Sequence, residues 1–290
     1  MRSTFTLGLT ALLIAWTAPM TSQAGPDEMT WRRIEPENLV LVELKDGQFV
    51  LELNSTFAPA TVAQFKRLVR EDFYRGLSFY RVIEGFVAQG GDESDIGFPS
   101  KEPTIDAEFE IDWRDELPWT RVEKNDAFGA ETGFMDGFAA ARHKEHAWLT
   151  HCPGVIAMAR TNDPDSSRTD FYIVIGQAPR YLDRNLNVFG RVIDGMDSVQ
   201  RIRRGPIREN GVIEKDLERS RIRRMHVISD LPIESRKEYL VMDTRSKGFK
   251  TYMEERRKRQ DDFFAQTPPP VLDVCQLPVQ TRIHTPPQTD

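Results

Sequence analysis

Residues 79–92 read FYRVIEGFVAQGGD and form the most informative segment of this 290-residue chain. The segment alternates as a β-strand does, yet it carries an arginine among apolar residues and ends in a glycine pair followed by an aspartate. Because a guanidinium in apolar surroundings is costly to desolvate, Arg81 requires a partner or a chemical role. Gln89 supplies both a hydrogen-bond donor and an acceptor, and Phe79 and Phe86 are expected to be aromatic walls. This combination suits a neutral ligand with a carbonyl better than a phosphate or a metal ion.

Short alternating segments on both sides of residues 79–89 predict a mainly β protein. Residues 40–44 and 49–53 flank the sequence KDGQ, a strong signal for a β-hairpin. Helical periodicity is found at residues 59–73 and 196–202. Many short strands, glycine turns and two helices favour a closed β-barrel with helical caps. The remaining predicted strands are 154–159, 171–175, 188–193 and 221–228.

The charge of the chain argues against a general nucleic-acid binder. Its formal net charge is −6, so its overall field does not attract phosphates. Arginines recur between residues 201 and 224, but acidic residues lie among them. This stretch is therefore interpreted as a solvated face or a surface for an acidic partner.

Residues 1–24 are predicted to be a secretory signal peptide. A positive start at Arg2, an apolar run over residues 7–16 and small residues up to Ala24 fit that pattern. Since the apolar run is too short to span a bilayer comfortably, we expect cleavage near Ala24 and a periplasmic protein without stable membrane insertion. An uncleaved anchor is the alternative.

Cys152 and Cys275 are the two cysteines of the chain. In an oxidising compartment they can pair and tie the tail to the body, whereas two buried free thiols are the alternative. The spacing of His143, His146 and His151 relative to Cys152 does not match a strong zinc signature, so no metal site is predicted.

Two long segments depart from the β pattern. Residues 93–150 are rich in aromatic side chains, which argues against disorder and predicts an ordered insertion. Residues 231–290 are predicted to be a charged, helical and proline-containing extension, with the helix over residues 235–266.

Residues 38–230 resemble the cyclophilin family of peptidyl-prolyl cis-trans isomerases, with residues 93–150 as the insertion. The family pattern F-x-R-x-I-x-G-F-x-x-Q-G-G-D runs unbroken through residues 79–92. The resemblance implies an eight-stranded antiparallel barrel capped by two helices, and isomerisation of X-Pro bonds without a cofactor or metal. It also implies proline-containing polypeptide substrates, and we expect a monomer. Further matching segments are 59–65, 151–160, 182–183 and 188–196.

The same resemblance assigns the site. Arg81 falls on the catalytic arginine and Gln89 on the glutamine that binds the substrate backbone. The implied substrate-binding residues are Phe79, Phe86, Val87, Ala159, Arg160, Asp170, Phe171, Tyr172, Tyr181, Leu182 and Leu186.

The chain departs from the family at several of these positions. Asp170 stands for a glutamine, and two hypotheses follow: it forms an ion pair with Arg81 or Arg160, or it draws Arg81 away from the substrate. Either is expected to lower or shift substrate preference. Tyr172 keeps the aromatic floor but adds a hydroxyl. The other substitutions are Val87 for methionine, Arg160 for asparagine, Tyr181 for tryptophan and Leu186 for histidine.

Two functions remain open from the sequence. One is an isomerase that assists the folding of exported proteins, favoured by Arg81, Phe86 and Gln89. The other is a non-catalytic module that captures a proline-containing segment for a dedicated partner, favoured by Asp170, Arg160 and the appended segments. In a third interpretation, the aromatic insertion covers part of the groove and narrows the range of substrates.

Overall fold

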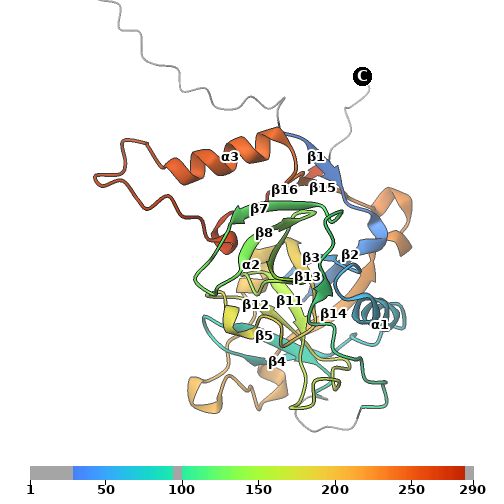
Figure 1. Ribbon diagram of the computed structural model, residues 1–290. Coiled ribbons are helices and arrows are strands. Elements are labelled where there is room, and N and C mark those ends of the chain that lie inside the picture. The colour runs from blue at the N-terminus through green and yellow to red at the C-terminus, as the bar shows by residue number, and fades with distance from the viewer. Residues whose placement is uncertain (1–28, 94–99, 285–290) are drawn as a thin grey trace, which may run out of the picture.

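The computed structural model describes residues 29–93 and 100–284. Its centre is a closed barrel of eight antiparallel strands, which confirms the predicted fold class (Figure 1). Around the barrel the strands follow the order β11-β12-β5-β4-β14-β2-β3-β13. Their bounds are β2 (Leu39–Leu44), β3 (Gly47–Leu53), β4 (Ser78–Val82), β5 (Val87–Gly91), β11 (Val155–Met158), β12 (Phe171–Val174), β13 (Val188–Asp194) and β14 (Ser220–Val227).

Two helices pack onto the barrel interior, as predicted. They are α1 (Pro59–Arg70) and α2 (Met196–Gln200). Phe65 of α1 lies against barrel aromatics, with ring centroids 5.8 Å from Phe171 and 5.0 Å from Phe189. Val199 of α2 belongs to the same buried core.

The amino-terminal end of α1 takes its cap from the insertion. Pro59 suits the first turn, where its missing N–H costs nothing, but Ala58 at the N-cap has no side chain to accept a hydrogen bond. The Glu108 carboxylate accepts instead from the backbone N–H groups of Ala60 (2.8 Å) and Thr61 (2.9 Å). A carboxylate at this end also complements the helix dipole.

Residues 111–149 of the insertion fold as a second antiparallel sheet, in the order β6-β10-β9-β8-β7. The sequence predicted order here but no strands. The turns are short, and Gly137 adopts a positive φ in the turn between β8 and β9. The strands are β6 (Ile111–Asp112), β7 (Trp119–Glu123), β8 (Glu131–Met135), β9 (Phe138–His143) and β10 (His146–Leu149).

The C-terminal extension is less helical than predicted. Residues 238–242 form a strand, β15 (Glu238–Met242), which pairs with both β1 (Trp31–Arg33) and β16 (Thr281–His284). The prediction of a helix over residues 235–266 is therefore wrong at its start, because pairing with distant strands overrides local propensity. The helix α3 is confined to Lys247–Lys258 and begins where the Ser246 hydroxyl accepts from the Phe249 N–H.

Several single turns of 3₁₀ helix connect these elements. They are η1 (Pro36–Asn38), η3 (Arg180–Leu182), η4 (Ile207–Glu209), η5 (Asp216–Glu218), η6 (Ile228–Asp230), η7 (Ile233–Ser235) and η8 (Val274–Gln276).

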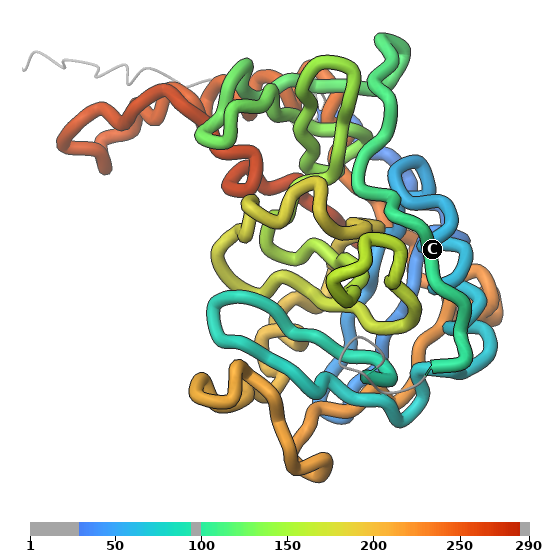
Figure 2. Tube along the Cα trace, turned by 60° about the horizontal axis from the view of Figure 1, so that its bottom comes forward, coloured from blue at the N-terminus to red at the C-terminus, as the bar shows by residue number. Residues whose placement is uncertain are grey.

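The insertion and the C-terminal extension share a second core on the outside of the barrel. Figure 2 shows the C-terminal residues beside the insertion, at one side of the barrel. Phe134 of β8 and Phe249 of α3 meet edge to face at 5.5 Å, and Val174 of the barrel joins the same apolar cluster.

A buried carboxylate also fastens the insertion to the barrel. Glu52 of β3 accepts from Arg32 (2.6 Å) and Arg191 (2.8 Å). The same two guanidinium groups donate to the backbone carbonyls of Asp136 and Gly137, in the turn between β8 and β9. Glu52 is 3% exposed, so its two partners are needed to offset its desolvation.

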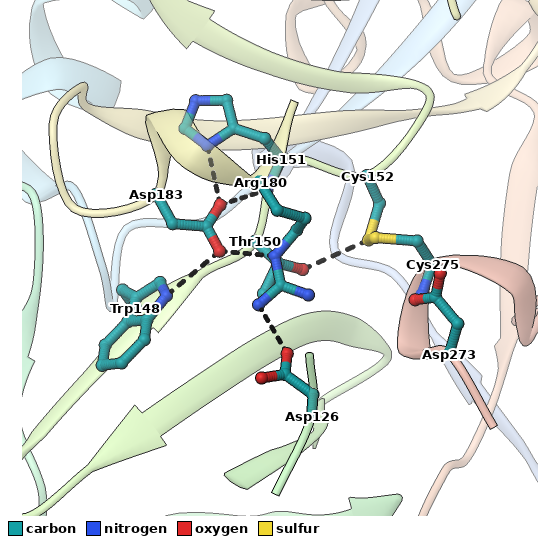
Figure 3. Close-up of a disulfide and its surroundings, with 9 residues drawn as sticks. All are labelled: Asp126, Trp148, Thr150, His151, Cys152, Arg180, Asp183, Asp273 and Cys275. Carbon is teal, nitrogen blue, oxygen red and sulfur yellow. Dashed lines mark hydrogen bonds and ion pairs between the residues drawn. A yellow bond between two sulfur atoms is a disulfide. The ribbon is translucent and has the colours of Figure 1, made fainter. Parts of the chain in front are cut away.

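Cys152 and Cys275 form a disulfide, which settles the alternative that the sequence left open (Figure 3). It joins the residues before β11 to η8, across a sequence separation of 123. The tail is therefore covalently fixed to the barrel. The predicted signal peptide lies outside the described residues. Within the described ranges, no helix combines the length and the apolar character that crossing a bilayer requires.

Removing this disulfide is expected to destabilise the protein. Because the bond closes a long loop, Cys275→Ser is expected to lower the free energy of unfolding by about 2–5 kcal/mol, measured by chemical denaturation under non-reducing conditions. A reductant is expected to lower the wild-type midpoint similarly and to leave the double variant Cys152→Ser/Cys275→Ser unchanged. A wild-type midpoint that is insensitive to full reduction would contradict this.

Candidate active site

A bulge in β4 organises the candidate site. Phe79 pairs with Gly90 of β5, but Arg81 pairs with Gln89, so Tyr80 is an extra residue on the bulged strand. Without the bulge, Phe79 and Arg81 would face the same side of the strand. With it, Phe79 turns into the barrel core, whereas Tyr80 and Arg81 both reach the side chain of Gln89.

The strand register then aligns three polar or aromatic side chains across the outer face of the barrel. Gln89 pairs with Arg81 on one side and with Tyr172 of β12 on the other, and Tyr172 pairs in turn with Ala157. The structure therefore brings Arg81, Gln89 and Tyr172 into one row, as their shared assignment to a site requires.

Arg81 is held in place but stays partly exposed. One terminal nitrogen donates to Gln89 Oε1 at 2.8 Å, and Nε donates to the backbone carbonyl of Asn210 at 3.2 Å. These contacts orient the guanidinium and leave donor groups for a ligand, because a guanidinium carries five N–H groups.

Asp170 does not form the predicted ion pair. It is fully buried, and within the described part of the chain neither Arg81 nor Arg160 is ion-paired with it. Its Oδ1 accepts instead from the Tyr80 hydroxyl at 3.2 Å and from the Glu93 N–H at 2.9 Å. The assignment of Asp170 to substrate contact is therefore wrong, because Asp170 lies beneath the surface at β5.

A chain of hydrogen bonds links Asp170 to Arg81 through Tyr80 and Gln89. The Tyr80 hydroxyl donates to Asp170 and accepts from Gln89 Nε2 at 2.7 Å. This fixes the Gln89 amide with its oxygen towards Arg81. Gly91 makes the arrangement possible, because a Cβ there would lie 2.3 Å from Asp170 Oδ1.

Phe79 and Phe171 are core residues, which corrects their prediction as substrate-binding residues. Both are 0% exposed and pack edge to face inside the barrel, with ring centroids 5.9 Å apart. The bulge accounts for Phe79. Phe171 is excluded because the side chains of β12 alternate, so Phe171 faces inward where Tyr172 faces outward.

Five of the predicted apolar residues share one cluster on the outer face. The half-buried Phe86 is presented by a tight turn between β4 and β5, in which the Phe86 N–H donates to the Ile83 carbonyl at 3.1 Å and Gly85 adopts φ +71°. The five residues are Phe86, Val87, Ala159, Tyr172 and Leu186.

The three other predicted residues lie on neighbouring loops. Leu182 is half-buried and Tyr181 is 71% exposed, both on η3. Arg160 donates to the Asn185 carbonyl at 2.9 Å and lies over the ring of Phe109 of the insertion. These contacts hold Arg160 in its loop.

A buried polar network lies behind Tyr172. The Tyr172 hydroxyl is 2.8 Å from His151 Nε2, and His151 Nδ1 is 3.0 Å from Asp183 Oδ1. Figure 3 shows the continuation of this network, in which Asp183 also meets Arg180, and Arg180 meets Asp126 of the insertion. The floor of the apolar cluster is therefore braced by the insertion.

The surroundings of Tyr172 and Asp183 in this network set their charge states. Burial, and then the nearby Asp183 carboxylate, raise the pKa of Tyr172 well above its usual value, so its hydroxyl stays neutral. Burial by itself disfavours the charged form of Asp183. Hydrogen bonds from His151 and the Arg180 guanidinium outweigh this and lower the pKa of Asp183 below its usual value.

From the sequence, no role was assigned to Tyr80, Asp183 or Asp126, and His151 was considered only in the zinc signature that was rejected. Tyr80 looked like an ordinary strand residue, and only a register shift reveals its contact with Gln89. Asp183 and Asp126 lie 32 and 54 residues from the partners they bind, His151 and Arg180. No local pattern links residues at such separations.

The geometry supports electrostatic catalysis on a substrate group that carries no charge. A fixed, partly exposed cation lies beside an amide side chain and an apolar cluster with an aromatic floor. Such a site can hold an apolar ring and direct a donor at a carbonyl or amide nitrogen. Among residues 29–93 and 100–284, no group of three or more metal-ligating side chains is found.

Comparison with known proteins gives a consistent result. Residues 39–227 match the family described as "Cyclophilin type peptidyl-prolyl cis-trans isomerase/CLD". A probable peptidyl-prolyl cis-trans isomerase from Brucella suis biovar 1 is 36% identical over 180 residues, covering 62% of this chain and 79% of that protein. A peptidyl-prolyl cis-trans isomerase from Acinetobacter baylyi is 30% identical over 181 residues, covering 59% and 76%.

A solved structure is similar over more than the barrel. The crystal structure of cyclophilin AquaCyp293 from Hirschia baltica superposes with a TM-score of 0.73 at 30% sequence identity. The match covers 92% of this chain and 97% of that one, so it includes elements outside residues 39–227.

The Asp183 network is expected to make stability depend on pH. Because the folded-state pKa of Asp183 is lowered, its carboxylate stabilises the fold above about pH 4, and this contribution is lost as the pH falls through the folded-state value. Asp183→Asn is therefore expected to reduce the free energy of unfolding by about 1–3 kcal/mol near neutral pH.

The difference between wild type and Asp183→Asn is expected to narrow below about pH 4, as measured by denaturant titration across pH. The matched control is Asp46→Asn, which changes an exposed carboxylate in the turn between β2 and β3. A difference that widened on acidification would refute the role given to Asp183.

Proposed function

Because the chain belongs to the cyclophilin-type peptidyl-prolyl cis-trans isomerase family, we propose that it accelerates rotation about X-Pro peptide bonds during the folding of exported proteins. The observation that carries the proposal is the row of Arg81, Gln89 and Tyr172 beside the apolar cluster with Phe86. We further propose that it acts as a monomer on proline-containing polypeptides, without a cofactor, nucleic acid or membrane insertion.

The reaction requires no bond to be broken. Resonance gives the peptide bond a rotation barrier of about 18–20 kcal/mol, while the trans preference before proline is only about 0.5–1 kcal/mol. At the twisted state the C–N bond loses double-bond character, and the prolyl nitrogen becomes pyramidal and basic. A catalyst needs to bind this state more tightly than either planar state.

Arg81 is the group proposed to make that difference. Its guanidinium donates to the prolyl nitrogen or the substrate carbonyl more strongly at the twist than in the planar ground state. Gln89 and the Asn210 carbonyl hold the guanidinium beforehand, so little reorganisation is needed at the moment of rotation.

The apolar cluster is proposed to bind the proline ring. Phe86, Val87 and Leu186 line it, Tyr172 forms its floor, and the His151 contact keeps the added hydroxyl engaged. Leu182 on η3 and Gln89 at the strand row would hold the substrate on either side.

Two residues that favoured the alternative function, a non-catalytic binding module, no longer support it. Asp170 is buried and orients Gln89 through Tyr80, so it does not withdraw Arg81 from a ligand. Arg160 donates to the Asn185 carbonyl and lies over the Phe109 ring, so its guanidinium is already engaged.

We propose export to the periplasm as the setting. Residues 1–24 have the composition of a signal peptide, and a disulfide between Cys152 and Cys275 suits an oxidising compartment. Uncatalysed prolyl isomerisation takes tens to hundreds of seconds, so a catalyst there has an evident use.

Arg81→Ala is expected to reduce kcat/KM about 10²- to 10³-fold, because it removes a donor aimed at the twisted amide. Exchange NMR on a short proline peptide measures the interconversion rate directly and separates catalysis from a shift in populations. The matched control is Arg223→Ala, an exposed arginine of β14, which is expected to keep the wild-type rate. Retention of the wild-type rate by Arg81→Ala would exclude the mechanism.

Export predicts a mature protein that begins at Gly25. Expression of the full chain in a bacterial host, followed by periplasmic extraction and N-terminal sequencing, is expected to find that residue first. A variant lacking residues 2–24 is expected to stay in the cytoplasm. Full-length protein in the cytoplasm of cells expressing the intact chain would contradict export.

A further inference from the structure

Two large aromatic side chains remain exposed on η3 and on the insertion loop that contacts it. Tyr181 on η3 is 71% exposed and precedes Leu182, the proposed pocket wall. Phe128 is 58% exposed in the loop between β7 and β8 of the insertion. We propose that Phe128 and Tyr181 form an apolar subsite that binds a large apolar side chain close to the substrate proline. This rests on the proposed isomerase function and adds a substrate class to it.

The loop that carries Phe128 is held in one conformation by its own hydrogen bonds. Asp126 Oδ1 accepts from the N–H groups of Phe128 (2.8 Å) and Ala130 (3.1 Å). The Asp126 N–H donates in turn to the Ala130 carbonyl at 2.8 Å. An aspartate that binds the backbone two residues ahead is a typical way to fix a tight turn.

A buried cation then links Phe128 to η3. Arg180 is 5% exposed, and its guanidinium carbon lies 4.8 Å from the centre of the Phe128 ring. The same guanidinium forms ion pairs with Asp126 at 3.0 Å and with Asp183. Because Tyr181 follows Arg180 in the chain, one desolvated guanidinium holds the Phe128 ring close to the backbone turn that carries Tyr181.

A buried hydrogen-bond network joins the subsite to the floor of the proposed proline pocket. Asp183 receives Arg180 on one carboxylate oxygen and His151 on the other, and His151 meets the Tyr172 hydroxyl. Figure 3 shows Asp126, Arg180, Asp183 and His151 in one connected group. A polypeptide with its proline at Tyr172 therefore has Tyr181 and Phe128 on the insertion side of the site.

The exposure of both rings and the fixed position of the Phe128 ring together favour ligand binding. An exposed aromatic ring forgoes much of its burial free energy, and a ring already fixed loses little conformational entropy on binding. By contrast, the 86% exposed Phe263 lies in the irregular segment after α3, where its ring contacts that of its neighbour Phe264. Phe263 is thus a matched control for a merely exposed aromatic.

The test uses the full chain and a set of short peptides that share one proline and carry phenylalanine or alanine at each neighbouring position. The wild-type protein is expected to have a higher kcat/KM for a phenylalanine peptide than for its alanine counterpart. Phe128→Ala and Tyr181→Ala are each expected to reduce that ratio about two- to tenfold, mainly through KM. Phe128→Tyr and Phe263→Ala are each expected to keep the wild-type ratio of kcat/KM values.

The outcomes distinguish a failure of the proposed subsite from a failure of the proposed isomerase function. If the wild-type protein accelerates none of the peptides, the isomerase function fails and the subsite fails with it. If it accelerates all of them equally, or if Phe128→Ala keeps the wild-type ratio, the isomerase function stands and the subsite is overturned.

Discussion

The extra residue in β4 is the constraint on which the candidate site depends. One inserted position turns Phe79 into the barrel and places Tyr80 and Arg81 together against Gln89. The side chain that fills the core and the side chain proposed to contact the substrate thus come from the same short strand. Bulges are typical where a strand must redirect a functional side chain, and here the redirected group is the only cation in the strand.

The insertion and the C-terminal extension pack against the barrel and help to hold it together. The insertion supplies the cap of α1 through Glu108 and the anchor of Arg180 through Asp126, and its turn between β8 and β9 receives the guanidinium groups paired with Glu52. The C-terminal extension packs on the insertion through Phe249. The barrel, the insertion and the extension therefore stabilise one another.

The sequence was sufficient for the barrel, because strand alternation is a local property, and the resemblance to the cyclophilin family supplied most of the apolar cluster. It failed at Phe79, where a register shift changes the facing of the strand, and at residues 238–242, where partners from both ends of the chain impose a strand. The network behind Tyr172 was not predicted, since most of its contacts join residues that are far apart in the sequence. The role given to Asp170 was wrong because burial depth is not visible in a motif.

The number of cysteines simplifies the maturation of this chain. With Cys152 and Cys275 alone, one intramolecular pairing exists, so an oxidant suffices and no shuffling of mispaired bonds is needed. During synthesis, Cys275 emerges after the last barrel strand, β14. The Cys152 thiol therefore has no partner until every barrel strand has been synthesised. The disulfide can then form in a barrel that has already folded.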